Sequence, residues 1–367
     1  MRVFEYVSYV LILQANDQRL EDAKAYLQSL QQMERAKVTD VVEQYDLVIV
    51  VITMNRDAAL NDNDRQIYRL GYLTQTVARL LQIVHADISP EFQHKKLIVC
   101  NVDAHPSTFT EALDLSDHVQ VVSRYQNRTA KLHDIMTENV FEKEKDDYMY
   151  CLQTAGGFLS RYYLVLEDDV LLEENAIETL YFMMNYFDLF AAVDWLFVKL
   201  YYPEKWSGYD WSSQTVAEIG SYSLLVGSLC AGVALLLPVH RKWSWSCRTL
   251  PLWFRFMVGA VFAALVCLSI GRQHVESWRS NFVSTHRLTE ASGCCTQATL
   301  YAAHLIPDLS AHLGRVRSTY DFAVDIAVNG FAHIRGLKCY RVEPNIIKHI
   351  GLLSTIGRNS KSAKHFL

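Results

Sequence analysis

The chain has 367 residues, half of them hydrophobic and 20% charged, with a formal net charge of −5. This length and apolar content suit one large domain or two modest ones with a real core, and they exclude a disordered chain. A net negative charge with no long basic run argues against nucleic acid as the main partner, because phosphate binding needs a clustered positive surface.

The N-terminal residues 1–17 are apolar only in short pieces and are interrupted by Glu5. This segment is too short and too broken to predict a membrane span or a signal peptide. One interpretation is that it is the remnant of an anchor in a longer parent chain.

Short β-branched runs then alternate with helical stretches. The predicted strands are residues 46–53, 96–103, 119–123, 162–167 and 195–200, and the predicted helices are residues 64–85, 146–160 and 173–186. Continuous apolar strands that alternate with helices are typical of a mostly parallel sheet covered on both faces. The sequence therefore predicts an α/β fold, in which ligands bind beyond the carboxyl ends of the strands. No GxGxxG or Walker pattern supports a dinucleotide fold or a P-loop.

The fourth predicted strand ends in three consecutive acids, Glu167, Asp168 and Asp169. Adjacent carboxylates repel one another unless a cation lies among them, and oxygen ligands suit hard divalent metals such as Mg²⁺ or Mn²⁺. A solvated strand end that caps a helix is the structural alternative. The local sequence leaves both interpretations open.

Two segments, residues 221–239 and 251–271, are long enough to cross a membrane as helices and contain Arg255 as their one charged residue. A pair of buried core helices is the alternative, but the Gly and Ala content favours a transmembrane hairpin. The connecting residues 240–248 carry three basic residues and two tryptophans. A short basic loop marks the cytoplasmic side, which places the rest of the chain in a lumen or outside the cell.

The hairpin (residues 221–271) divides the expected α/β domain into residues 1–220 and 272–367. The sequon at Asn127 fits a lumenal compartment. Disulfides can form there, whereas cysteines in the spans and the basic loop are expected to be reduced. The lumenal cysteines are Cys100, Cys151, Cys294, Cys295 and Cys339, and the others are Cys230, Cys247 and Cys267. Their pairing cannot be deduced from the sequence.

A strand that ends in Glu-Asp-Asp resembles the metal motif of GT-A glycosyltransferases, in which acidic side chains hold Mn²⁺ on the diphosphate of a nucleotide sugar. The segment Glu343–Gly357 resembles the end of the N-acetylglucosaminyltransferase IV domain. The hairpin is similar to that of the Golgi GPI-glycan N-acetylgalactosaminyltransferases, a family that the chain resembles from about residue 45 to residue 357. The resemblance implies a GT-A-like α/β domain, with a Rossmann-like sheet, interrupted by a transmembrane hairpin.

This resemblance implies roles for individual residues. Asp169 is the expected metal ligand, with Glu167 and Asp168 contacting ribose, metal-bound water or metal. His349 matches the C-terminal His that completes the metal and diphosphate site in GT-A folds. A lone His in an apolar segment is more often structural, but the acidic motif and the following Gly351 favour function.

An inverting transfer also needs a carboxylate base for the acceptor hydroxyl. Asp325 is the first choice, because a carboxylate among apolar neighbours is costly to bury without a function. Val-Asp-Ile at 324–326 also resembles the Val-Asp-Trp of the transferase IV domain, although the Trp is absent. Asp321 is the second choice and is interpreted mainly as a helix cap.

The loop after the first strand supplies the expected nucleotide contacts, Thr53, Asn55 and Arg56, because GT-A enzymes bind uridine and phosphate there. A loop Arg is otherwise often only solvated. Three aromatic residues before the first span stack on a sugar or form an interfacial belt. They are Trp206, Tyr209 and Trp211.

The resulting hypothesis is a Mn²⁺- or Mg²⁺-dependent inverting glycosyltransferase that moves N-acetylgalactosamine from UDP-GalNAc to a mannose of the GPI glycan of anchored proteins. It is a multi-pass Golgi membrane protein with a lumenal transferase domain, in contact with membrane lipid. One alternative is an N-glycan branching N-acetylglucosaminyltransferase. A noncatalytic membrane scaffold is the other.

Overall fold

The computed structural model of the chain consists of two compact units. Residues 1–202 and 286–367 form the first, called the α/β unit, and residues 203–285 form the second, called the helix-pair unit. The structure describes residues 2–34, 44–56, 70–87, 94–126, 139–190, 194–203, 209, 213–236, 251–272, 275, 286–291, 293 and 295–351. The α/β unit thus contains chain from both sides of the helix-pair unit.

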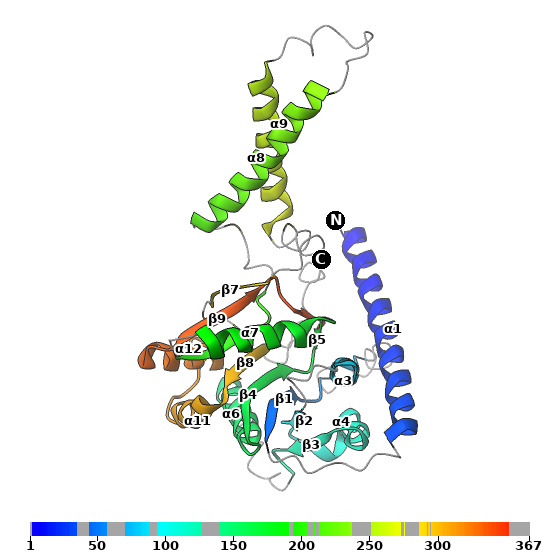
Figure 1. Cartoon of the computed structure of the whole chain (residues 1–367). Coiled ribbons are helices and arrows are strands. Elements are labelled where there is room, and N and C mark those ends of the chain that lie inside the picture. The colour runs from blue at the N-terminus through cyan, green and yellow to red at the C-terminus, as the bar shows by residue number, and fades with distance from the viewer. Residues whose placement is uncertain are drawn as a thin grey trace. The chain divides into compact units, whose positions relative to one another are not determined.

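An eight-stranded sheet forms the centre of the α/β unit, in the order β3-β2-β1-β4-β8-β6-β9-β7 (Figure 1). The first half is parallel and consists of β1 (Tyr45–Thr53), β2 (Lys95–Asn101), β3 (Gln120–Ser123) and β4 (Ser160–Glu167). Thr53 pairs with Asn101, and Ile52 pairs with Glu167. The carboxyl ends of these strands therefore meet at one edge of the sheet.

The second half of the sheet is mixed. It consists of β6 (Trp195–Lys199), β7 (Arg287–Glu290), β8 (Ala298–Ala302) and β9 (Lys338–Glu343). Strand β8 is antiparallel to both β4 and β6, whereas β6 and β9 are parallel. Because β8 follows the helix-pair unit in sequence but lies between two strands that precede it, neither part of the chain can complete the sheet alone.

A small second sheet pairs β5 (Val170–Leu172) with β10 (Ile347–His349) in antiparallel register. His349 lies opposite Val170 in this register. The pairing brings the C-terminal end of the described chain next to the acidic turn that follows β4.

The strands of the central sheet are apolar without alternation, because both faces are covered. Residues 47–51 of β1 and 164–166 of β4 are 0% exposed. A sheet with one solvated face would alternate apolar and polar residues. The predicted α/β class with a largely parallel sheet is therefore confirmed.

The helices of the α/β unit follow the strands in the expected alternation. They are α3 (Tyr72–Ala86), α4 (Thr110–Asp114), α6 (Val140–Gly156), α7 (Ala176–Phe190), α11 (Ile306–Leu313) and α12 (Val324–Arg335), with short 3₁₀ turns η3 (Pro106–Thr108), η4 (Leu115–Asp117) and η7 (Ala303–Leu305). The N-cap of α6 is Asn139, whose side chain accepts from the N–H groups of residues 141 and 142. Helices α6, α11 and α12 pack on one another.

Helix α1 (Arg2–Glu34) packs against α3. Its buried residues recur at helical spacing: Leu20, Ala23, Leu27 and Leu30. The Nδ2 of Asn16 also donates to the backbone oxygen of Leu70 at 3.3 Å. Residues 2–17, whose apolar pattern is interrupted, are thus part of one continuous helix. The regularly spaced apolar positions of this helix lie at residues 20–30. Of the described helices, α1 is not among those apolar enough to cross a membrane.

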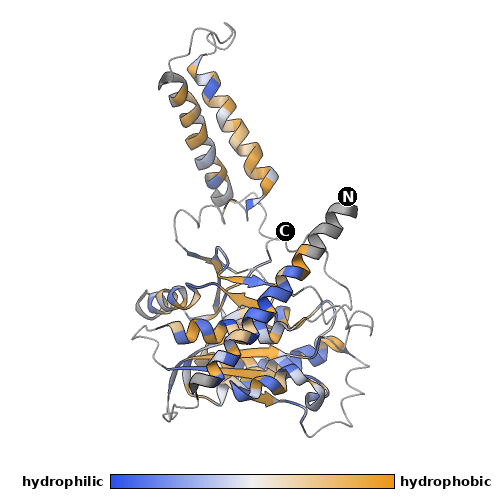
Figure 2. Ribbon diagram, turned by 90° about the vertical axis from the view of Figure 1, so that its right-hand side faces the viewer, coloured by the Kyte–Doolittle hydropathy of each residue, from blue (hydrophilic) through white to orange (hydrophobic). Residues whose placement is uncertain are grey.

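The helix-pair unit contains α8 (Ser213–Leu236) and α9 (Leu252–Ile270), which are coloured mainly as hydrophobic in Figure 2. Among the described residues, these are the two helices long and apolar enough to cross a membrane. They pack through glycines: a Cβ on Gly227 would lie 2.8 Å from the backbone oxygen of Phe256, and one on Gly259 would lie 2.8 Å from Sγ of Cys230. Most of their apolar side chains remain exposed, such as Leu224 at 61%.

Of the six described cysteines, three are disulfide-bonded and three are free. A disulfide joins Cys100 in β2 to Cys151 in α6, and Cys295 is also disulfide-bonded. Cys339 is a free thiol, as are Cys230 and Cys267. Cys339 was expected on the side where disulfides can form, and it is not disulfide-bonded in the structure.

Several predicted features lie outside the described residues. They are the sequon at Asn127, the basic loop 240–248, Cys247, Cys294, Trp206 and Trp211. Of the predicted helices, residues 64–69 also lie outside. The described part of that helix begins at Tyr72, and the helix expected at residues 146–160 begins earlier, at Val140.

Candidate active site

The three consecutive acids lie in a tight turn between β4 and β5, at the carboxyl edge of the parallel strands. The hydroxyl of Thr76 in α3 donates to the backbone oxygens of Asp168 and Val170, at 2.7 and 2.9 Å. The backbone N–H of Glu167 donates to the backbone oxygen of Gln297 at 2.8 Å. These bonds fix the backbone from which the three carboxylates project.

The guanidinium of Arg56 lies among these carboxylates. Its Nη2 is 2.6 Å from Oδ1 of Asp168, and its Nη1 is 2.8 Å from Oδ2 of Asp169. Glu167 is farther away, with Oε2 at 4.0 Å from Nη2. The hydroxyl of Thr53 donates to the other oxygen of Asp168 at 2.7 Å. Because Asp168 and Asp169 are 2% and 0% exposed, Arg56 supplies the positive charge that their burial requires.

Burial and neighbouring charges shift the pKa values of the groups in this cluster. Burial and the neighbouring Asp169 raise the pKa of Glu167 to about 7, against the opposing effect of Arg56. Burial also raises the pKa of Asp168. Burial would lower the pKa of Arg56, but the three carboxylates outweigh it and raise the pKa further, so this residue stays cationic. Three acids face a single guanidinium here, so a further cation would stabilise their ionised forms.

His349 and Asp169, the predicted metal ligands, are adjacent. Nε2 of His349 is 3.2 Å from Oδ2 of Asp169, and the ring of Tyr201 stacks on the imidazole with centroids 5.7 Å apart. Gly351 provides the space: a Cβ built there would lie 2.7 Å from Cγ of Asp169. The sequence thus correctly predicted that these two residues come together.

The Asp169 and His349 pair fits a divalent ion with two protein ligands. Adjacent ligands of an octahedral ion with bonds of about 2.1 Å are about 3 Å apart, close to the 3.2 Å between the two atoms. No group of three His, Cys, Asp or Glu side chains in the described part of the chain is arranged to hold a metal. Mg²⁺-type ions commonly take one or two protein ligands and complete their shell with substrate phosphates and water.

Asp325 lies in the first turn of α12, where two backbone N–H groups hold its carboxylate. Cys295 donates to Oδ2 at 2.9 Å and Ile326 donates to Oδ1 at 2.8 Å. The next two residues reach the acidic turn, since Thr296 donates to Oε1 of Glu167 at 3.4 Å and Gln297 accepts from its backbone. The segment 295–297 therefore connects Asp325 directly to the end of β4.

Asp321, the second candidate for the base, is exposed, unlike Asp325. The residue at the N-cap of α12 is Ala323, which makes no side-chain cap. The interpretation of Asp321 as the cap is therefore wrong, because the helix begins at Val324, three residues later. Asp325 is also only half-buried, so it escapes part of the burial penalty on which its selection rested.

The expected nucleotide residues lie beside the acidic turn. Thr53 and Arg56 contact Asp168, as described above, and the backbone N–H of Asn55 donates to Oδ2 of Asp103 at 2.9 Å. Asp103 follows β2 and is 8% exposed. Asp103 was not among the residues expected in the site, although its position at the end of the predicted second strand indicated that it lies at the same edge of the sheet.

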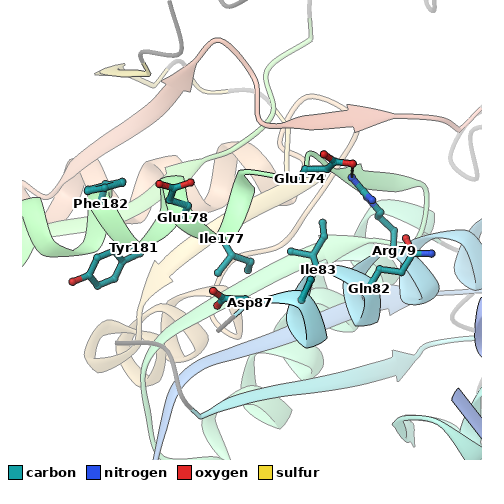
Figure 3. Close-up of a pocket in the computed structure, with 10 residues that line it drawn as sticks. Arg79, Gln82, Ile83, Asp87, Glu174, Ile177, Glu178, Tyr181 and Phe182 are labelled. Carbon is teal, nitrogen blue, oxygen red and sulfur yellow. Dashed lines mark ion pairs between the residues drawn. The ribbon is translucent and has the colours of Figure 1, made fainter. Parts of the chain in front are cut away.

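A groove of about 610 Å³ lies between α3 and α7 and is separate from these residues (Figure 3). Apolar side chains such as Ile83, Ile177 and Phe182 line it, and Arg79 and Glu174 form an ion pair of 3.9 Å at one end. No candidate site residue lines it. The edge of the sheet at the acidic turn is the better candidate active site, because carboxylates, an arginine and a histidine lie together there.

The fold is that of an α/β protein in which buried carboxylates, a cationic side chain and a His converge at the carboxyl ends of parallel strands, the edge where such folds place their ligand sites. Residues 47–348 match the family described as GPI-N-acetylgalactosamine transferase PGAP4. The match spans more than four-fifths of the chain. The chain belongs to this family, and family membership implies a glycosyltransferase that acts on the GPI glycan.

Proposed function

We propose that the chain is a metal-dependent, inverting glycosyltransferase that moves N-acetylgalactosamine from UDP-GalNAc to a mannose of the GPI-anchor glycan. Family membership supports the sugar and the acceptor. The observation that carries the metal and diphosphate part is the convergence of Arg56 and His349 on one buried oxygen of Asp169, at 2.8 and 3.2 Å.

The half-sheet β3-β2-β1-β4 supports a GT-A-like domain, because it is Rossmann-like and ends in the acidic turn. In such a domain the nucleotide lies over the ends of β1 and β2. Thr53, Asn55 and Asp103 are the polar groups available there. Glu167 and Asp168 lie where ribose or metal-bound water is expected.

Arg56 has two tasks in this proposal. In the free protein its guanidinium pairs with Asp168 and Asp169. When the donor is bound, the same guanidinium also contacts the diphosphate. Asp169 and His349 would hold Mn²⁺ or Mg²⁺, which would supply positive charge for the leaving diphosphate.

Asp325 is the proposed base. The acceptor oxygen forms a bond to the anomeric carbon while the bond from that carbon to the diphosphate oxygen breaks, and Asp325 takes the hydroxyl proton. Its two backbone hydrogen bonds orient the carboxylate, and the segment 295–297 holds it near the acidic turn.

The apolar helices α8 and α9 support a place in a membrane, here proposed as the Golgi membrane with the transferase domain in the lumen. Their exposed apolar surface would be unfavourable in water. A membrane-bound enzyme meets a lipid-linked acceptor at a raised effective concentration without any new contact. The helix pair would thus be useful to an enzyme with a lipid-linked acceptor, whereas an enzyme with a soluble glycoprotein acceptor would not need it.

The test is transfer by the purified chain from a panel of UDP-sugars to a synthetic GPI core glycan, with Mn²⁺ present or chelated. We expect transfer from UDP-GalNAc that chelation abolishes. Transfer only from UDP-N-acetylglucosamine would support the branching enzyme instead. No turnover with any donor would support the noncatalytic scaffold.

A further inference from the structure

The candidate metal ligand His349 lies on a strand of three residues, and its backbone does not determine the plane of its ring. Strand β10 pairs with β5 through residues 347–349, which fixes where the side chain of His349 begins. The torsion χ2 is broad in histidine, because it turns a planar ring about an sp³–sp² bond. A metal ligand has to be held within about 10–20° of its productive orientation. Another group must therefore hold the imidazole.

The ring of Tyr201 is in the position to do this. It lies on the imidazole of His349 with centroids 5.7 Å apart and an angle of 25° between the planes. Tyr201 is half-buried and follows the end of β6 by two residues. Offset stacking of two rings is attractive beyond the burial of their surfaces, so the contact restricts rotation about χ2. With the ring in this plane, Nε2 is 3.2 Å from Oδ2 of Asp169.

Hydrogen bonds hold the backbone on both sides of Tyr201. The N–H of Tyr202 donates to Oδ1 of Asn345, and Nδ2 of Asn345 donates to the backbone oxygen of Tyr202, both at 2.9 Å. The Asn345 side chain thus makes the pair of bonds that the backbone of a neighbouring strand would make. On the other side, the N–H of Ile346 donates to the backbone oxygen of Leu200 at 3.3 Å.

These residues are the ones at which the chain leaves the α/β unit. Tyr202 is the last residue of that unit before the helix-pair unit begins at Pro203. Tyr202 is buried, and the guanidinium of Arg341 lies 4.5 Å from the centroid of its ring. The segment that leads into the apolar helices is therefore fixed from within the α/β unit, next to the candidate metal site.

We propose that Tyr201 is a positioning residue of the metal site, which sets the orientation of the His349 imidazole, and that Asn345 positions Tyr201 in turn. The inference rests on the proposed function, in which Asp169 and His349 hold the metal, and adds how the histidine is held. Loss of a group that orients a metal-ligating histidine commonly lowers metal affinity or activity by about 10–100-fold. Tyr201 acts on the affinity for the metal and leaves the nucleotide contacts unchanged.

The test compares Tyr201→Leu with Tyr201→Phe, which keeps the ring, and with Tyr45→Leu. Tyr45 is the matched control, because it is also half-buried against another ring, that of Phe158, but begins β1 at its amino end. The purified full chain with UDP is titrated with Mn²⁺, and bound Mn²⁺ is measured by electron paramagnetic resonance. We expect the Kd for Mn²⁺ to rise about tenfold in Y201L and to stay within about twofold of the parent in Y201F and Y45L.

Kinetics with UDP-GalNAc and the synthetic GPI core glycan separate positioning from a structural role. In Y201L the Mn²⁺ concentration for half-maximal turnover should rise by about the same factor as the Kd, while turnover at saturating Mn²⁺ stays within about threefold of the parent. A fall of maximal turnover with an unchanged Mn²⁺ requirement would overturn the proposal. An unchanged Kd for Mn²⁺ in Y201L would overturn it as well.

Asn345→Ala tests the second step, because it removes both bonds with Tyr202. The Kd for Mn²⁺ should rise, and the double variant Y201L/N345A should bind Mn²⁺ within about twofold of Y201L alone. Losses that multiply in the double variant would show that Asn345 does not act through Tyr201.

His349→Ala in the same titration distinguishes a failure of this inference from a failure of the proposed function. A parent that binds no Mn²⁺, or an H349A protein with the Kd of the parent, would overturn the metal site itself. A raised Kd in H349A together with an unchanged Kd in Y201L would overturn only the role of Tyr201.

Discussion

Glycine at position 351 is required by its neighbour and not by its backbone conformation. The carboxylate of Asp169 occupies the space that a side chain would need, so Asp169, His349 and Gly351 form one unit in which each position constrains the others. This is the most tightly packed contact of the candidate metal site. It also makes the site sensitive to a single methyl group.

Gly351→Ala should displace the Asp169 carboxylate. We expect a loss of about 1–3 kcal/mol of stability from overpacking and a weaker apparent affinity for Mn²⁺, measured by thermal unfolding and by metal titration of turnover. Gly330→Ala in α12 is the control, because a Cβ there meets nothing within 4 Å, and it should be neutral or stabilising. Equal effects of the two changes would mean that the contact with Asp169 does not matter.

Asp325→Asn tests the base. General base catalysis contributes roughly 10²–10⁴-fold, so transfer should fall by about that factor while the Kd for UDP, measured by calorimetry, stays within a few fold. The control is Asp321→Asn, since Asp321 is exposed, and it should leave both quantities unchanged. Loss of UDP binding in D325N would make Asp325 a structural residue or a substrate ligand.

The residues of the candidate site could be found from the sequence where they follow a strand or belong to a motif. Thr53, Asp168 and Asp169 were visible for this reason, and His349 through its resemblance to known enzymes. Thr296 and Gln297 were not, because their hydrogen bonds with Glu167 join distant parts of the chain, which no local pattern encodes.

At the level of elements, small residues determine how α8 and α9 pack. Gly227 and Gly259 allow the two backbones to approach, as is common for helices that associate in membranes. Apolar attraction cannot hold two helices together in lipid, where the surroundings are equally apolar. The close approach at the two glycines therefore carries much of the association.

Gly259→Leu should separate the helices, because a Cβ at this position already overlaps the side chain of Cys230. We expect a loss of about 1–3 kcal/mol, seen as a lower Tm in detergent. Gly232→Leu in α8 is the matched control, since a Cβ there meets nothing within 4 Å. A stable G259L protein would show that the glycine contact does not hold the pair.

The sequence predicted most strands in the first part of the chain but none in the second, and it missed α1, the longest of the described helices. Apolar strands such as β1 and β4 were found nearly to the residue, because their burial on both faces leaves a continuous β-branched run. The strands β5, β7, β8, β9 and β10 were missed. They are three to six residues long, and their pairing partners are distant in sequence, so only the assembled sheet defines them.

At the level of the whole molecule, the helix-pair unit is an insertion in the sequence of the α/β unit, whose sheet contains strands from before and after it. Strand β8 from the second part of the chain lies between β4 and β6 from the first. The candidate site follows the same division, with the acidic turn in the first part and both Asp325 and His349 in the second. Activity therefore requires both parts of the chain in one folded domain, and the inserted apolar helices connect that domain to the proposed membrane.

The most direct test of the acidic turn as the metal and diphosphate site is the turnover of Asp169→Asn with UDP-GalNAc and a GPI core glycan, in the presence of Mn²⁺. Loss of charge stabilisation worth several kcal/mol should reduce turnover at least about a hundredfold, while unfolding in detergent remains a single cooperative transition. Turnover above about half that of the parent, with the same dependence on Mn²⁺, would contradict the account, because the acidic turn would then not be the place where the metal and the diphosphate bind.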